Sequence, residues 1–125
     1  MSHPYQYVVI RYVPRVDRGE CINVGVVLHS QSAGVLRCAY HLDEERILAL
    51  APGSDLTSLR AALDAVGEMC ERPPSEVTSA LSTAGKRFGW ISAPRSTVLQ
   101  PGAVHGGASR DPEAEVGRLL QHLVR

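Results

Sequence analysis

The first forty residues alternate apolar and polar side chains in three runs, which turn-forming residues separate. Residues 5–13 are rich in tyrosine, valine and isoleucine, residues 21–29 are rich in β-branched side chains, and residues 35–40 form the third run. Such alternation is typical of half-buried strands. The connections, 14–20 and 30–34, are short and contain proline, aspartate or glycine. We therefore expect consecutive strands to pair in an antiparallel meander.

The alternation also predicts which side chains share a face of this sheet. If even positions pair with even positions, one buried face carries Val8, Ile10, Tyr12, Ile22, Val24, Val26, Leu28, Leu36, Cys38 and Tyr40. The opposite face then carries Arg11, Asn23, Val27, Arg37 and His41. In this register Arg11 lies across from Asn23.

Helical spacing follows in the middle of the chain and at its end. Residues 42–50 contain Asp43-Glu-Glu, and the helix macrodipole favours this negative charge at an N-terminus. Ser54 or Asp55 can cap a second helix, whose apolar stripe is Leu56, Leu59, Leu63, Val66 and Cys70. A short helix is expected over residues 75–84, and Gly85 is expected to stop it. Asp111-Pro112-Glu113 predicts the start of a last helix.

The segments between these helices predict one or two later strands. Residues 88–92 and 97–100 are expected as strands, with Pro94 and Pro101 as boundaries. Residues 102–109 are rich in glycine and are expected as a loop. The 125 residues then form one α+β domain, residues 1–125. Its antiparallel sheet has helices packed on one face.

Charge and composition narrow the classes of partner. Thirteen basic residues balance thirteen acidic ones, so no global field attracts nucleic acid. Nucleic-acid binding through Lys86, Arg87 and Arg95, with stacking on Phe88 or Trp90, is a minor alternative. No apolar run approaches the roughly 20 residues of a membrane span, and the N-terminus does not resemble a signal peptide. The cysteines are isolated and odd in number. We therefore predict a cytoplasmic protein that does not contact a membrane.

Two polar groups near the first strands are candidates for chemistry. Arg11 and Asn23 can bind a phosphate or a carboxylate, since arginine offers a planar fork of donors. The alternative is an ordinary solvent-exposed sheet face. In the first turn, Arg18 and Glu20 can clamp a charged group or belong to a solvated charge cluster.

The third candidate is the segment Arg95-Ser96-Thr97 with the downstream His105. Hydroxyls and backbone N–H groups in a glycine-rich loop can cradle oxyanions. The segment contains neither a phosphate-binding P-loop nor a Gly-x-Ser-x-Gly elbow, so it predicts no catalytic serine. The histidines and cysteines lack the spacing of metal ligands, and we predict neither a metal site nor a cofactor.

Two motifs carry a family resemblance. They read Arg11-Tyr-Val-Pro…Arg18-Gly-Glu…Asn23-Val-Gly-Val-Val-Leu28 and Pro94-Arg-Ser-Thr-Val…His105…Asp111-Pro112. With both, the chain resembles the bacterial domain of unknown function family 3037 nearly end to end. That family has no assigned activity, and its members are often encoded beside proteins that resemble HipA-like kinases. The resemblance implies a partnership with a kinase-fold protein.

Two hypotheses of function follow, and the sequence leaves open whether the protein is an enzyme. The first is a non-enzymatic partner or adaptor of a kinase-like protein, which docks through the sheet face with Arg11, Asn23 and Arg37. The second is a small enzyme or binding protein for a phosphorylated or carboxylated ligand. Its pocket would unite both motifs, with Arg11, Arg18, Asn23, Arg95, Ser96 and His105. A homodimer is a further way to cover the second sheet face.

Overall fold

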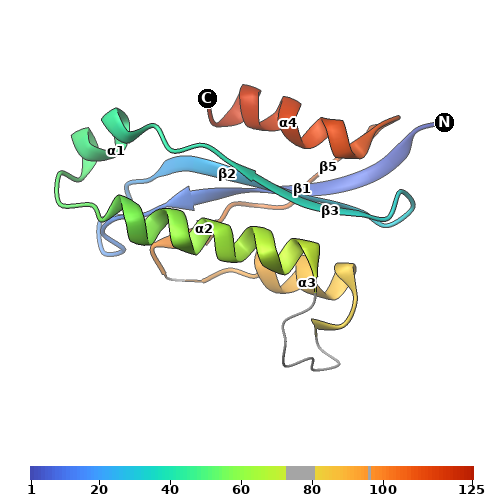
Figure 1. Ribbon diagram of the computed structural model, residues 1–125, viewed down its shortest axis with the longest axis horizontal. Coiled ribbons are helices and arrows are strands. Elements are labelled where there is room, and N and C mark those ends of the chain that lie inside the picture. The colour runs from blue at the N-terminus through green and yellow to red at the C-terminus, as the bar shows by residue number, and fades with distance from the viewer. Residues whose placement is uncertain (73–80, 96) are drawn as a thin grey trace.

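Three long strands run back and forth and make up most of a five-stranded antiparallel sheet (Figure 1). The computed structural model of the chain describes residues 1–72, 81–95 and 97–125. The long strands are β1 (His3–Tyr12), β2 (Ile22–Ser30) and β3 (Val35–Tyr40). Two short strands, β4 (Leu99–Pro101) and β5 (His105–Ser109), lie one after the other along the outer side of β1. The fold is α+β, and the predicted meander is confirmed. Of the two predicted later strands, the one over residues 97–100 is confirmed in part by β4.

The helices begin where side chains cap their free N–H groups. They are α1 (Glu44–Leu50), α2 (Leu56–Glu71), α3 (Ala84–Ser92) and α4 (Pro112–Leu123). The caps of α1, α2 and α4 are Asp43, Asp55 and Asp111. The cap Asp111 is as predicted, and Asp55 is one of the two caps that the sequence offered for α2. No helix within the described ranges is long and apolar enough to cross a membrane.

A β-bulge in β2 changes the predicted arrangement of side chains. Ile10 pairs with Gly25 but Arg11 pairs with Asn23, so Val24 is an extra residue on β2. Beyond the bulge the alternation is inverted. Val26 and Leu28 therefore lie on the second face, and Val27 lies on the first, which corrects the predicted register.

This inversion gives the sheet two apolar faces, and helices cover both rather than the one that was predicted (Figure 1). On the first face, α2 and α3 pack over Val8, Val27 and Leu36. On the second face, α4 packs mainly over β2 and β3, where Val116 and Leu119 join the buried cluster of Val26, Leu28 and Val35. The C-terminal helix, and not a second chain, thus covers this part of the second face.

Two further segments differ from the sequence prediction. Residues 88–92 were predicted as a strand, but they belong to α3, which Thr83 caps and which buries Phe88 and Ile91 on one side. Residues 105–109 were predicted as a loop, but they form β5. There, the Tyr5 ring lies against Gly107, and a Cβ atom at Gly107 would be 2.5 Å from the Tyr5 hydroxyl. Glycine is needed at position 107 because β1 and β5 approach closely there, and not because the chain turns.

The short helix that was predicted over residues 75–84 falls largely outside the described residues. The described part of this prediction is wrong at its end. Gly85, predicted to stop the helix, lies in the first turn of α3.

Candidate functional site

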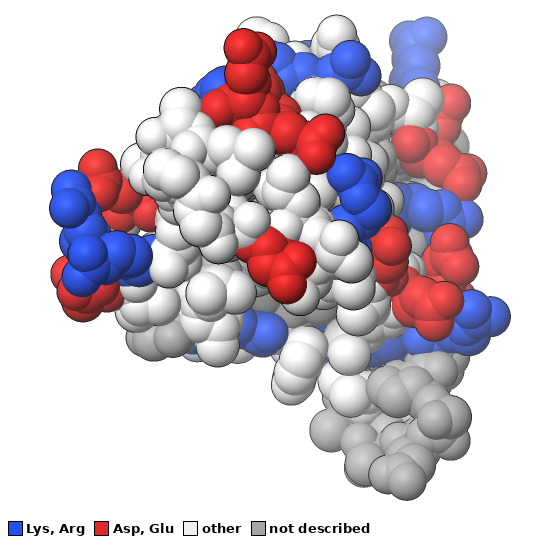
Figure 2. All heavy atoms as spheres, turned by 60° about the vertical axis from the view of Figure 1, so that its left-hand side comes forward, with Lys and Arg blue, Asp and Glu red and all other residues white. Residues whose placement is uncertain are grey.

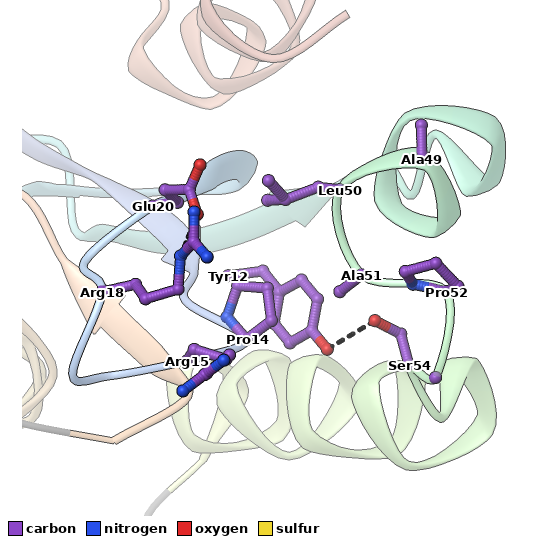
Figure 3. Close-up of a pocket in the computed structure, with 11 residues that line it drawn as sticks. Tyr12, Pro14, Arg15, Arg18, Glu20, Ala49, Leu50, Ala51, Pro52 and Ser54 are labelled. Carbon is purple, nitrogen blue, oxygen red and sulfur yellow. Dashed lines mark hydrogen bonds and ion pairs between the residues drawn. The ribbon is translucent and has the colours of Figure 1, made fainter.

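An open hollow lies at one end of the sheet (Figure 3). Its volume is about 600 Å³, and it is open to solvent. One wall is the β1–β2 loop, and the other is the turn between α1 and α2. We call it the end pocket, and it is lined by Tyr12, Pro14, Arg15, Arg18, Glu20, Ala49, Leu50, Ala51, Pro52, Gly53 and Ser54.

The shape of the loop wall follows from two residues. Pro14 ends β1 because it fixes its own backbone and has no N–H group for the sheet. Gly19 has a φ of 76°, a left-handed conformation that other residues rarely adopt. The N–H groups of Arg18 and Gly19 both donate to the Arg15 carbonyl oxygen at 3.0 Å. This turn holds Arg15 and Arg18 on the pocket side of the loop (Figure 3).

Each arginine of the pocket has an acidic neighbour in the same loop. Arg15 Nη2 lies 2.9 Å from Asp17 Oδ2, and Arg18 Nε lies 2.6 Å from Glu20 Oε1. All four side chains are more than half exposed. Such surface pairs are worth about 0–1 kcal/mol, so they can be exchanged for other partners. The pocket therefore presents both signs of charge rather than a positive cluster.

The opposite wall is mostly backbone and small side chains. Ala51, Pro52 and Gly53 form the turn, and the Tyr12 hydroxyl lies 2.8 Å from Ser54 Oγ at its base (Figure 3). The start of α2 beside it is already capped. Asp55 accepts from the Ser58 hydroxyl at 2.7 Å and from the Ser58 N–H at 3.0 Å, and these bonds lower the pKa of Asp55.

Charges of both signs also alternate around this end of the molecule (Figure 2). Blue and red groups lie between uncharged ones, and no continuous field of one sign is visible in this view. A surface of this kind favours recognition of a specific arrangement of charges over general attraction of an anion.

Two of the predicted polar residues hold the C-terminal helix. The Asn23 side chain donates to the Leu123 carbonyl oxygen at 3.1 Å, at the end of α4, where helix carbonyls have no partner within the helix. Arg37 binds Glu113 in the first turn of α4, with Nη2 and Oε1 3.0 Å apart. These contacts give both residues a structural role at positions where the sequence predicted a docking face.

Arg11 lies across from Asn23 on β1, as predicted, and across from Gln100 of β4 on its other side. The two sequence motifs thus meet in space, because β4 and β5 both pair with β1. His105 pairs with Tyr7, and their rings stack with centroids 5.4 Å apart. Arg11 and His105 therefore lie where β1 pairs with the outer strands, and neither side chain lines the end pocket.

The remaining predicted residues lie on the side of α2 and α3. Arg95 and Thr97 line a small apolar hollow of about 210 Å³ between these helices and β4. The Arg95 guanidinium lies 4.4 Å from the centre of the Trp90 ring and donates to the Trp90 carbonyl oxygen. The Thr97 hydroxyl donates to the Leu99 carbonyl oxygen at 2.7 Å. Ser96 lies outside the described residues.

The predicted site residues that the structure describes thus lie in several places rather than in one pocket, and Asn23 holds the end of α4. Arg18 and Glu20 line the end pocket, Arg11 and His105 follow the outer strands, and Arg95 and Thr97 lie beside Trp90. The sequence missed the other wall of the pocket, 49–54. Its only signal is the Pro52-Gly53 turn, which does not say what it faces.

The side chains that metal binding, thiol chemistry and nucleic-acid contact would need are mostly buried or dispersed. Within the described residues, no three histidine, cysteine or acidic side chains gather as metal ligands would. Burial raises the pKa of the Cys38 thiol to about 12 and that of Cys70 to about 11, so neither forms a thiolate readily. Arg87 and Phe88, which the nucleic-acid alternative would need near the surface, are buried.

Comparison with known families explains the two motifs. The family model of DUF3037, described as a protein of unknown function, matches residues 7–124. The chain belongs to the DUF3037 family. This match spans β1 through α4 and includes both walls of the end pocket. No curated protein and no solved structure matches this DUF3037 chain.

Proposed function

We propose that this DUF3037 protein is a non-enzymatic binding partner of a kinase-fold protein, similar to HipA-like kinases. The partner docks at the end pocket and inserts a loop or side chains between the β1–β2 loop and the α1–α2 turn. The family resemblance supports the class of partner, since related proteins are encoded beside such kinases. The geometry of the pocket supports the docking site.

One observation carries this proposal: the arginines of the pocket are paired with acids in an open, solvated hollow. A site for a small anion gains affinity from cations that are free to bind it. Paired charges instead form a pattern of both signs, which a protein surface can match with its own charges. The pairs are weak, so exchanging them for partner contacts costs little.

The second candidate is a binding protein, or a small enzyme, for a phosphorylated or carboxylated molecule. It is favoured by the position of Arg15 and Arg18 on the same wall, where both guanidinium groups can turn toward one ligand (Figure 3). In this case Glu20 competes with the ligand for Arg18. The two candidates therefore predict opposite effects of removing the Glu20 charge.

The test is affinity isolation of tagged protein from the native bacterium, in five forms. They are the unchanged chain, Arg18→Gln, Glu20→Gln, and the controls Glu68→Gln and Arg72→Gln. The controls remove the charges of an equally exposed ion pair on α2, which lies outside the pocket. Co-isolated proteins and small molecules are quantified by mass spectrometry from the same eluate.

A protein partner predicts that Arg18→Gln and Glu20→Gln both reduce its recovery, by about three- to tenfold, while the controls do not. A small anion predicts that Arg18→Gln reduces recovery of that anion and Glu20→Gln raises it. Recovery of a kinase-fold protein that neither pocket variant changes would contradict docking at the end pocket. Recovery of a small anion without any protein would contradict the proposed function.

A further inference from the structure

The outer edge of β5 is an open sheet edge. β5 pairs with β1 on one side, and no other strand among the described residues pairs with its far side. His105, Gly106, Gly107 and Ala108 are exposed. An edge of this kind presents free backbone N–H and C=O groups to another chain.

This edge lacks the features that usually prevent strand pairing. Edge strands are commonly blocked by lysine, proline, inward-pointing charges or a covering element. β5 reads His-Gly-Gly-Ala-Ser and contains neither lysine, proline nor a carboxylate. α4 contacts β5 over one face of the sheet only and leaves the edge open. Nothing on β5 itself therefore opposes an added strand.

Side chains from β1 lie over one face of β5, and no bulky side chain from β1 covers its outer edge. The Tyr5 ring lies against Gly107, and the Tyr7 ring stacks on His105. The rings of β1 occupy the face of the sheet beside β5, whereas the edge consists of backbone with the small side chains of Gly106, Gly107 and Ala108. A partner strand can approach such an edge without a steric clash.

A positive charge from β1 lies beside this border, in addition to the exposed Arg110 just beyond β5. The Arg11 guanidinium lies over Gly102, where a Cβ atom would be 3.0 Å from Nη2. Within the described part of the chain, the Arg11 side chain forms no hydrogen bond or ion pair, although its backbone pairs with β2 and β4. Gly102 precedes His105 by three residues, or roughly 10 Å of extended chain. An added strand that continues past His105 therefore meets an unpaired guanidinium.

We propose that the β5 edge binds an extended segment of another protein as an added strand, and that an acidic side chain of this segment pairs with Arg11. Backbone hydrogen bonds would supply affinity, and the Arg11 contact would set the register. A five-residue edge is too short to supply the roughly 800 Å² per partner of a stable protein dimer. The occupant is therefore a short segment rather than a second copy of this chain.

This inference is separate from the end pocket, because the two surfaces share no residue. Its test starts from a phage-displayed library of random 12-residue peptides, selected against the full chain. Selected peptides are synthesised, and their contacts are mapped by amide hydrogen exchange and by nuclear magnetic resonance of the chain. Each peptide is also made with its acidic residue replaced by the amide, and with alternate backbone nitrogens methylated.

We expect the selected peptides to slow the exchange of the β5 amides. Methylation of the peptide backbone nitrogens should abolish their binding. Arg11→Gln and the amide-substituted peptide should each weaken binding by about tenfold or more, whereas Arg11→Lys should retain most of it. Combining Arg11→Gln with the amide peptide should give no further loss. The matched variant Arg110→Gln, which removes an exposed arginine just beyond β5, should leave binding unchanged.

Three results would overturn the proposal. One is a library that yields no peptide protecting the β5 amides. Another is peptides whose binding does not depend on Arg11 or on their own backbone N–H groups. The third is a chain that dimerises without peptide and protects β5 in the dimer, because the occupant would then be a second copy.

Discussion

The two faces of the sheet are stabilised in different ways. On the first face, α2 and α3 bury a large apolar cluster in which Val8, Ile47 and Leu63 are fully enclosed. On the second face a single helix, α4, buries a smaller cluster and adds polar contacts through Asn23 and Arg37. α4 lies mainly over β2 and β3 and leaves the outer strands more accessible.

This difference separates residues that fold the chain from residues that are free to recognise another molecule. Asn23 and Arg37 are polar because they hold a helix end and a helix start. Arg11, one strand further out, is also polar, but among the described residues its side chain makes no such contact with a helix. A polar residue on a sheet face thus indicates recognition only after the helices that cover the face have been located.

The largest effect expected from this comparison is at the centre of the first face. Leu63→Ala should cost about 3–5 kcal/mol of unfolding free energy, because Leu63 is fully enclosed and leaves a cavity. Leu119→Ala on α4 should cost about 2 kcal/mol, since this helix can settle onto a smaller cluster. Urea unfolding followed by circular dichroism measures both. Equal losses would mean that the two faces contribute alike.

The next effect concerns two adjacent glycines of β5. Gly107→Ala should cost about 1–3 kcal/mol, because the new Cβ atom would meet the Tyr5 hydroxyl at 2.5 Å. Gly106→Ala is the matched control, since its nearest neighbour would be the Tyr5 carbonyl oxygen at 3.7 Å. It should stay within about 0.5 kcal/mol of the unchanged chain. If both variants behave alike in thermal unfolding, the close approach of Tyr5 does not explain the glycine.

A smaller effect distinguishes Asn23 from its neighbour Arg11. Asn23→Ala should cost about 1 kcal/mol, because it removes one hydrogen bond to the end of α4. Hydrogen exchange in α4 should accelerate, while exchange in α2 stays unchanged. Arg11→Ala should change neither, within about 0.5 kcal/mol. An acceleration in both helices would show that the two faces unfold as one unit.

The smallest effect is a dependence on pH that originates on the first face. His29 stacks on Phe88 with ring centroids 5.5 Å apart, and burial lowers the pKa of His29 below its ordinary value near 6.5. The unfolded chain then binds a proton more readily than the folded chain. Stability should therefore be complete above pH 6.5 and fall as the pH drops from there toward the folded pKa.

The measurement for His29 is the urea midpoint between pH 7.5 and pH 5. The variant His29→Gln removes the titrating group, so its midpoint should vary less over this range. His122 on α4 is exposed, and His122→Gln is the matched control that should keep the full dependence. A midpoint for His29→Gln that still falls as steeply would assign the effect to other groups.

Much of the fold could be predicted because its signals are local. Strand alternation and helix capping depend only on residues that are close in sequence. This holds for β1 to β3 and for the caps Asp43, Asp55 and Asp111. The bulge at Val24 could not be predicted from alternation, because one inserted residue leaves the sequence pattern unbroken while it inverts the faces. β5 was missed for a similar reason, since the need for Gly107 comes from Tyr5, a hundred residues earlier.

The candidate site was predictable only in part. The loop wall is visible as a charged turn, and the pairing of Arg11 with Asn23 followed from the strand pattern. The wall formed by 49–54 depends on where α1 leaves the sheet, which no local pattern fixes. The hydrogen bond from Asn23 to Leu123 likewise joins residues 100 positions apart, so no local pattern predicts it.

The most direct test of the central claim is hydrogen exchange on the complex isolated from the native bacterium, compared with the free chain. If a protein partner docks at the end pocket, exchange should slow in residues 13–21 and 49–54, while the solvent-facing side of α2 and α3 remains unchanged. Slower exchange confined to α2 and α3 would contradict this account. So would an isolate that contains a bound small anion and no protein partner.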